Sequence, residues 1–194
     1  MISQNHYIIN NNRNFLRLFP GLQYIIQVRK VNRDTQKNHY FMVDVISEAI
    51  KTEENAILLF LGRGDAAESV REYAMKKGVS EHIEFMGSRT DISRFYQAMD
   101  LFLFPSFHEG LPIAGVEAQA ADLPCLFSDA VTSEIMITDR AVSVPLDLGA
   151  AEWAKKSISL AKICGRKNVS DKITASGYDA ADMGKRMRQI YEQQ

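Results

Sequence analysis

The sequence predicts an α/β fold: a Rossmann-like, doubly wound parallel sheet in a single domain. Short apolar runs alternate along the chain with longer segments whose apolar residues recur at helical spacing. Strands that alternate with helices favour parallel pairing through right-handed crossovers. The chain has 194 residues, of which 46% are hydrophobic and 24% charged, and this suits one ordinary globular domain with its own core.

The first half of the chain begins with a polar, Asn-rich segment. Residues 1–20 are interpreted as a linker or remnant that ends at a Pro20-Gly21 turn, and residues 21–194 as the folded domain. A first strand is expected over 23–28, and a helix over 38–52 because its apolar residues share one face. Next come a buried strand at 56–61, a helix at 66–77 stopped by Gly78, a short strand at 82–86 and a helix at 90–99.

The second half repeats the alternation. Three strands are expected, at 101–104, 125–128 and 141–144. The helices are expected at 112–121, from Thr132 onward, at 149–162, and twice between 169 and 194. In a doubly wound sheet the ligand lies outside the carboxyl ends of the strands. The loops to inspect are therefore 62–65, 87–91, 107–112 and 128–134.

Residues 109–124 read EGLPIAGVEAQAADLP and are the most informative stretch of the chain. They follow a predicted strand and the pair Pro105-Ser106, so a helix N-terminus is expected at the carboxyl edge of the sheet. Gly110 allows close approach of the backbone to a ligand, and Pro112 suits the first helical turn, where its missing N–H is not needed. The free N–H groups of Leu111, Ile113 and Ala114, together with the helix dipole, favour binding of phosphate.

Two carboxylates, Glu109 and Glu117, lie eight residues apart in this stretch. Glu117 falls about one and a half turns into the helix, where a carboxylate can accept both hydroxyls of a ribose. Glu109 precedes the helix, close to where a sugar would hang from a diphosphate. An isolated pair of this kind is usually two solvated acids, so the interpretation depends on the whole stretch.

The stretch resembles the donor-binding domain of group 1 glycosyltransferases, which have the GT-B fold and a retaining mechanism. The family signature is close to PS-x-x-EG-x-P-x-x-x-x-EA-x-A-x-G-x-P. It is matched here by Pro105, Ser106, Glu109, Gly110, Pro112, Glu117, Ala118, Ala120 and Pro124. Asp122 stands where the family usually has Gly, and would strain the turn if φ must be positive. Gly115 stands where a larger apolar residue is common.

The resemblance covers almost the whole chain, through QKNHYFMVDVI, LFLGRGDAAESVREYAMKKGVSEHIEFMGSRTDI and GYDAADMGKRMRQIYEQ. It implies that a Lys at the first helix and an Arg after the first strand grip the donor diphosphate. Lys37 fits the Lys position. The usual Arg position is occupied by Asn32, in a segment longer by about three residues, so Arg29 is chosen and Arg33 is the alternative.

Further contacts are implied by the same resemblance. Gly62 and Gly64 border the donor site, although Gly-x-Gly alone is weak evidence for nucleotide binding. Ser88 and Arg89 lie where the backbone of the family contacts the base; Arg89 either stacks on the base or sits in solvent. Thr132 either caps a helix with Glu134 or reaches the donor, and the cap is favoured.

The implied activity is transfer of a sugar from a nucleotide diphosphate, most often UDP, to an acceptor hydroxyl, with Glu109, Lys37 and Arg29 as the catalytic residues. ADP- and GDP-sugars are alternatives. No cofactor and no metal are expected. The implied partners are the donor and a glycan or lipid-linked acceptor held by an N-terminal domain that this chain lacks. The setting is cytoplasmic, with peripheral association of the full enzyme with the inner face of a membrane left open.

Composition and pattern argue against other classes. The net charge of -1 provides no basic field for nucleic acid, and no apolar run approaches the ~20 residues of a membrane span. The four His are scattered without metal-ligand spacing, and Cys125 and Cys164 form no scaffold, Cys125 being expected in the core. A nicotinamide-dependent enzyme would need G-x-G-x-x-G after the first strand, where no glycine occurs before Gly62. The main alternative is a non-catalytic module that holds a nucleotide sugar or docks on another chain.

Overall fold

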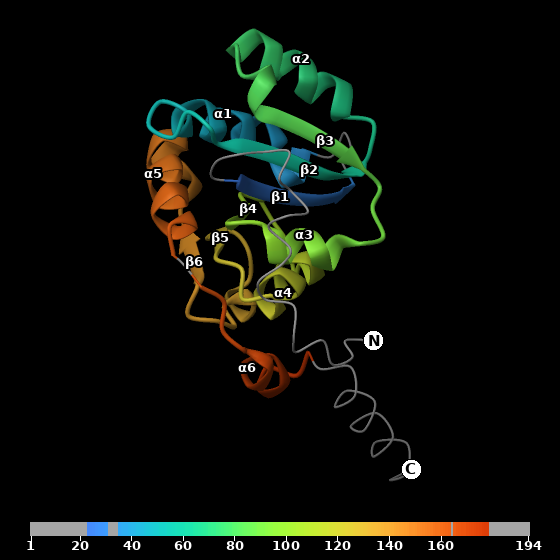
Figure 1. The fold of residues 1–194 in the computed structure, drawn as a ribbon, viewed down its shortest axis with the longest axis vertical. Coiled ribbons are helices and arrows are strands. Elements are labelled where there is room, and N and C mark those ends of the chain that lie inside the picture. The colour runs from blue at the N-terminus through green and yellow to red at the C-terminus, as the bar shows by residue number, and fades with distance from the viewer. Residues whose placement is uncertain (1–22, 31–34, 164, 179–194) are drawn as a thin grey trace.

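The computed structural model describes residues 23–30, 35–163 and 165–178, which form an α/β domain around one sheet (Figure 1). The six strands have the order β3-β2-β1-β4-β5-β6, and every neighbouring pair is parallel. The order reverses between β1 and β4, which is the switch point of a doubly wound fold. The strands are β1 (Gln23–Lys30), β2 (Ile57–Arg63), β3 (Ile83–Gly87), β4 (Leu101–Phe104), β5 (Cys125–Ser128) and β6 (Ala141–Val144).

Helices cover both faces of the sheet (Figure 1). One face carries α1 (His39–Ala49), α2 (Ala67–Lys77) and α5 (Gly149–Ala161); the other carries α3 (Ile92–Ala98) and α4 (Ile113–Ala120), with α6 (Ser170–Ala175) beside α4. Single 3-10 turns occur at η2 (Thr35–Lys37), η3 (Ser80–His82), η4 (Ser133–Ile135) and η5 (Leu146–Leu148). The predicted Rossmann-like, doubly wound architecture is confirmed.

Two apolar clusters, one on each face, hold the layers together. Phe60 and Trp153 belong to the α1, α2 and α5 side, where the Trp153 indole donates to the Pro145 carbonyl at 2.9 Å. Four Phe side chains, at 95, 102, 104 and 127, make up much of the α3 and α4 side. All six are at most 1% exposed, so the centre of the sheet is dry on both faces, and β4 is wholly apolar and buried.

Most of the predicted elements agree with the structure to within a few residues, and 101–104, 125–128 and 141–144 agree at both ends. β1 runs two residues beyond the predicted 23–28 because Lys30 still pairs with Arg63 of β2. The helix expected from Thr132 is wrong: only the single turn η4 forms. Of the two helices expected between 169 and 194, one is α6. The second, the 1–20 segment with its Pro20-Gly21 turn, and Cys164 lie outside the described residues.

The structure shows what surrounds the two departures from the family signature, Asp122 and Gly115. Asp122 has φ 52, so the turn after α4 does require positive φ at this position. A Cβ on Gly115 would lie 2.8 Å from Cε1 of Phe127 and 3.1 Å from Cδ1 of Ile135, so the missing side chain makes room for the Phe127 ring. Cys125 is fully buried, as predicted, and burial raises the pKa of its thiol.

The amino edge of the sheet is closed by a cluster of charges around Asp122, here called the Asp122 clasp (Asp122, Arg140, Arg166 and Lys167). Asp122 accepts from the Lys167 amide at 2.6 Å and lies 3.4 Å from the guanidinium of Arg140. Arg166 donates to the carbonyls of Ala121, at 3.0 Å, and Met99. Burial lowers the pKa of Arg166 to about 10. The clasp ties the segment after α5 to the turns that precede β4, β5 and β6.

Candidate nucleotide-sugar site

The N-terminus of α4 opens at the carboxyl end of β4. Pro112 is the N-cap residue, with extended φ -76 and ψ 106, and its carbonyl accepts from Gly115 at 2.8 Å and Val116 at 3.3 Å. The amides of Ile113 and Ala114 precede these bonds and therefore have no acceptor within the helix. The predicted first helical residue, Pro112, is the cap instead, one position earlier, which leaves the same amides facing out of the helix end.

Glu109 lies in the loop between β4 and α4 and is partly buried. Its backbone forms an isolated parallel bridge with Val131, in the loop after β5. The same β4–α4 loop is joined to the segment before α1, because the amide of Phe107 donates to the Gln36 carbonyl at 2.8 Å and the Gln36 side chain donates to the His108 carbonyl. Three loops that are far apart in sequence thus meet around Glu109.

Lys37 is brought to this meeting point by the Gln36 contacts. Its Nζ lies 6.0 Å from the ring centroid of Phe104, the last residue of β4. This is the outer range of a cation–π contact. The structure therefore places a cation near the start of the loop that carries Glu109, although the two segments are 72 residues apart at the Gln36–His108 contact.

Glu117 lies on the side of α4 that faces α3. The Tyr96 hydroxyl is 3.2 Å from Oε2 of Glu117 and 3.2 Å from the carbonyl of Ala114. Tyr96 is 3% exposed, whereas Glu117 is only partly buried. The hydroxyl thus anchors one carboxylate oxygen against α3, in the first turns of the helix.

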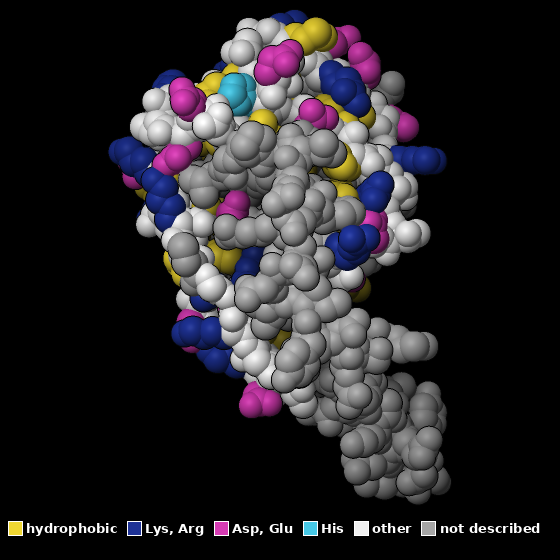
Figure 2. Space-filling model, in the orientation of Figure 1, with side chains coloured by type: hydrophobic (Ala, Val, Ile, Leu, Met, Phe, Trp, Pro, Cys, Tyr) yellow, Lys and Arg dark blue, Asp and Glu magenta, His cyan; other side chains and the backbone are white. Residues whose placement is uncertain are grey.

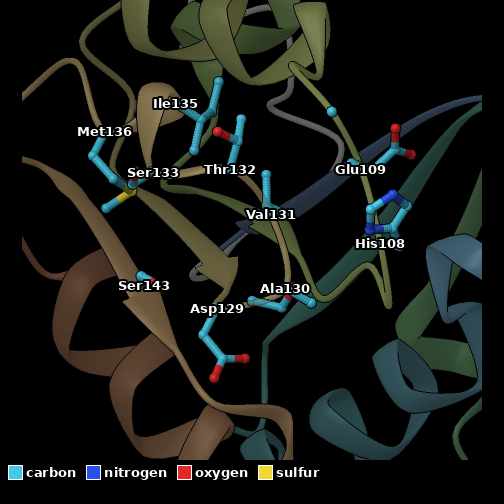
Figure 3. A pocket seen from close by; sticks show the side chains of 12 residues that line it. His108, Glu109, Asp129, Ala130, Val131, Thr132, Ser133, Ile135, Met136 and Ser143 are labelled. Carbon is cyan, nitrogen blue, oxygen red and sulfur yellow. The ribbon is translucent and has the colours of Figure 1, made fainter.

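A hollow of about 590 Å³ opens at the carboxyl ends of β5 and β6 (Figure 3). Glu109 and His108 line it from the loop after β4, Asp129 to Ser133 from the loop after β5, and Ser143 from β6 (Figure 3). Its twelve residues, here called the sugar-side hollow, are His108, Glu109, Gly110, Ser128, Asp129, Ala130, Val131, Thr132, Ser133, Ile135, Met136 and Ser143. Glu117 and Lys37 are not among them.

Of these twelve residues, only Glu109 and Gly110 were selected as site residues from the sequence; Asp129 and Ser143 are among those that were not. The 128–134 loop was marked as a loop of the carboxyl edge, but no motif singles out Asp129 within it. Ser143 is a strand residue whose exposure depends on β6 lying at the edge of the sheet, beside β5. Only the strand order reveals that these side chains share one hollow with Glu109.

The loops after β2 and β3 hold the other predicted contacts. Gly62 lies within β2 with φ 144, and Gly64 directly follows that strand. Ser88 and Arg89 are exposed after β3. Arg89 forms two bonds of 2.9 Å with the Asp91 carboxylate, which raise its pKa, and its guanidinium lies 5.3 Å from the Phe95 ring centroid.

Of the two candidate Arg residues, Arg29 and Arg33, the structure describes only the backbone of Arg29. Arg29 lies in β1, inside the strand rather than in the loop after it, at a shift in the β1–β2 register between Gln27 and Lys30. Its side chain and Arg33 lie outside the described part of the chain. The choice between them stays a prediction.

The predicted cap at Thr132 is confirmed: its Oγ1 accepts from the Glu134 amide, at 3.5 Å, in the turn η4. Two buried polar atoms at the carboxyl edge have no hydrogen-bond partner among the described residues, Ser106 Oγ and His39 Nε2. His39 begins α1 and is 4% exposed; burial, and then the nearby charge of Lys37, lower its pKa to about 4. Sequence reasoning grouped His39 with the scattered His and missed this burial.

The surface of the described residues mixes both signs of charge. Figure 2 shows Lys and Arg side chains interspersed with Asp and Glu over the face that it presents. The described ranges contain no group of three or more His, Cys, Asp or Glu placed to hold a metal ion. Within the same ranges, every helix is too short or too polar to cross a bilayer.

Strand order and the switch point define a doubly wound, Rossmann-like domain, and comparison with known proteins identifies its family. Residues 23–162 match the family described as glycosyl transferases group 1, and the chain belongs to this family. The protein EpsF of Bacillus subtilis (strain 168), named as a glycosyltransferase, is 29% identical over 152 residues, which are 74% of this chain and 38% of EpsF.

Two further comparisons agree with this assignment. An Escherichia coli UDP-Gal:α-D-GlcNAc-diphosphoundecaprenol α-1,3-galactosyltransferase is 28% identical over 97 residues, 48% of this chain and 25% of the relative. The crystal structure of Anabaena HepE in complex with UDP has a TM-score of 0.76 and 13% identity, and covers 94% of this chain and 53% of that one. The fold is that of a GT-B glycosyltransferase domain. The chain spans less than half the length of EpsF and of the Escherichia coli relative.

Proposed function

We propose that this chain is the donor-binding domain of a retaining glycosyltransferase, which transfers a sugar from a nucleotide diphosphate to an acceptor hydroxyl. One observation carries the proposal. The N-terminus of α4 opens at the carboxyl edge beside the switch point, with Glu109 just before it and Glu117 just inside it. This arrangement offers amides and dipole to phosphate and carboxylates to hydroxyls.

Each group has a role in the proposed site. Lys37 and Arg29 stabilise the diphosphate, on which negative charge grows as the glycosidic bond breaks. The backbone of the α4 N-terminus binds phosphate or sugar, through Gly110, Leu111, Pro112, Ile113 and Ala114. Glu117, anchored by Tyr96, accepts from the ribose hydroxyls. Glu109 contacts the donor sugar.

The base and its neighbourhood belong to the loops after β2 and β3. Gly62 and Gly64 leave the backbone open at the end of β2, and Ser88 and Arg89 follow β3 in the adjacent loop. Because Arg89 is already held by Asp91 at 2.9 Å, its guanidinium is presented as a fixed plane on which a base can stack.

UDP is the favoured nucleotide in this proposal. One curated relative is named as a UDP-galactose-dependent enzyme, and one solved neighbour was crystallised with UDP. The acceptor, a glycan or lipid-linked sugar, is bound by a further N-terminal domain, at the cytoplasmic face of a membrane. The chemistry needs no cofactor in this scheme, since side chains and the helix end supply positive potential.

Calorimetric titration of the purified chain with UDP, ADP and GDP, each with and without magnesium, tests the proposal. We expect saturable binding of one nucleotide whose affinity does not depend on magnesium. Binding of none of the three contradicts the donor-domain function and favours the alternative, a non-catalytic docking module. Binding that requires magnesium contradicts the metal-free part of the scheme.

A further inference from the structure

The carboxyl edge of the sheet is divided by charge at the switch point. On the β3–β2–β1 side lie Arg63 and Arg89, at the end of β2 and in the loop after β3, together with Asp65 in the loop after β2. Lys37 lies at the switch point itself, with its Nζ 6.0 Å from the ring centroid of Phe104 in β4. Asp91 on that side is taken up in its ion pair with Arg89. On the β4–β5–β6 side, the sugar-side hollow is lined by two carboxylates and by no Lys or Arg.

The lining of the hollow suits an uncharged, hydroxylated ring. Hydroxyl groups come from Thr132, Ser133 and Ser143, whereas the buried Ser128 hydroxyl donates to the Ser106 carbonyl. An apolar wall comes from Val131, Ile135 and Met136. A pyranose has the same two aspects, a rim of hydroxyls and an apolar C–H face. The bridge between Glu109 and Val131 joins two of the loops that form the walls, so their separation is fixed before a ligand arrives.

The carboxylates of the hollow come from different loops. Glu109 is partly buried in the loop after β4, while Asp129 is exposed in the loop after β5. A third carboxylate brought into the same hollow is repelled by both. Discrimination between ligands of equal shape can rest on such a repulsive contact.

We propose that the sugar-side hollow receives the donor sugar, and that Asp129 acts with Glu109 as a specificity determinant that excludes carboxylate-bearing sugars. The donor sugar is then a neutral or amine-bearing hexose rather than a uronic acid. This inference rests on the proposed donor-binding function. The same charge division orients the donor, with its diphosphate toward Lys37 and its sugar toward Asp129.

The test compares two donors that differ in one carboxylate. The 194-residue chain is first titrated with UDP, ADP and GDP, and then with glucose and glucuronic acid on the nucleotide that binds. We expect the glucuronic acid donor to bind at least about tenfold more weakly than the glucose donor. Asp129→Asn should narrow this gap, whereas Asp171→Asn, an equal charge change at an exposed site on α6, should not.

The outcomes separate this inference from the function on which it rests. Failure of all three nucleotides to bind contradicts the proposed function. Nucleotide binding with equal or tighter affinity for the uronic acid donor contradicts the selectivity alone. Asp129 is not the determinant if Asp129→Asn leaves the affinity difference between the two donors unchanged. The same holds if Asp171→Asn reduces that difference as much as Asp129→Asn does. Asp129 is exposed, so its variant should fold, which circular dichroism verifies.

Discussion

The two edges of the sheet differ in whether their buried polar groups have hydrogen-bond partners. At the amino edge, Asp122 and Arg166 are bonded to their own chain, through the Lys167 amide and the carbonyls of Ala121 and Met99. At the carboxyl edge, His39 Nε2 and Ser106 Oγ have no partner among the described residues, and the first amides of α4 have none within the helix. Buried polar groups are normally paired. Of the three unpaired buried side-chain atoms among the described residues, two lie at this edge and the third is Ser157 Oγ within α5, so the carboxyl edge is where a ligand is expected.

The largest expected effect is a loss of unfolding free energy when the Asp122 clasp at the amino edge is broken. Asp122→Ala removes the acceptor for the Lys167 amide and the counter-charge of Arg140 in a pair whose side chains are 4% and 12% exposed. Breaking a buried pair costs about 3–5 kcal/mol of unfolding free energy. Denaturant melts should show this loss, while calorimetry should show nucleotide affinity within about twofold of the parent chain.

Asp122→Asn is the matched control for that substitution. Asn tolerates the positive φ and keeps an oxygen acceptor, so we expect a distinctly smaller loss of stability. A loss below about 1 kcal/mol for Asp122→Ala would show that the clasp is not a stabilising element.

The next effect belongs to His39 at the carboxyl edge. Its pKa is lowered to about 4 in the folded chain, so the unfolded chain binds the proton first as pH falls below 6.5. The contribution to stability is therefore complete above about pH 6.5 and is lost as pH falls toward 4. A shift of this size corresponds to at most about 3 kcal/mol. His39→Phe should flatten this part of the stability profile; an identical slope in the variant would contradict the assignment.

The comparison is sharpened by a change that should affect binding and leave stability unchanged. Glu117→Gln keeps an acceptor for the Tyr96 hydroxyl but removes the charge offered to the ribose. Nucleotide affinity should fall by about 1–3 kcal/mol, the scale of a hydrogen bond to a charged group. Calorimetry on the folded variant measures it, with Tyr96→Phe as a control for anchoring. Unchanged affinity would remove Glu117 from the site.

The smallest effect is expected at Gly115, within α4. Gly115→Ala places a Cβ 2.8 Å from the Phe127 ring, and overpacking costs about 1–3 kcal/mol. The better helix propensity of Ala offsets about 1 kcal/mol of this. A net loss of about 0–2 kcal/mol in thermal or denaturant unfolding is the expected result, and Phe127→Leu in the same chain should recover part of it. Increased stability of the single variant would show that the ring moves freely.

The apolar periodicity predicted the sheet and most helices because the strands β2, β4 and β5 are largely buried and each helix is buried on one face. It failed after Thr132 because of a residue distant in sequence. Gln119, fully buried in α4, accepts from the amides of Ile137 and Thr138 at 3.1 and 2.9 Å and donates to the Ile135 carbonyl at 2.6 Å. These bonds hold the backbone after η4 in a shape other than a helix. No local propensity reports a bond made 16 residues away.

For the site, the sequence indicated residues that lie in one motif. Glu109, Gly110 and Glu117 occupy a single stretch, so their spacing alone predicted a helix N-terminus between two acids. Asp129 and Ser143 reach the sugar-side hollow from other segments and share it only because β4, β5 and β6 are neighbours. The clasp likewise joins Asp122 to a segment 45 residues away, a contact with no motif.

Because Asp122 holds the turn after α4 at positive φ and also belongs to the Asp122 clasp, the turn and the clasp should be transferred together in any chimera with a relative. A chimera that takes the α4–β5 turn from a relative with Gly at this position would gain backbone freedom. It would also remove the carboxylate that pairs with Arg140 and the largest of the negative charges acting on Arg166, so the substitutions at these three positions are expected to be strongly non-additive. Domain recombination should therefore place its crossover points outside residues 122–167.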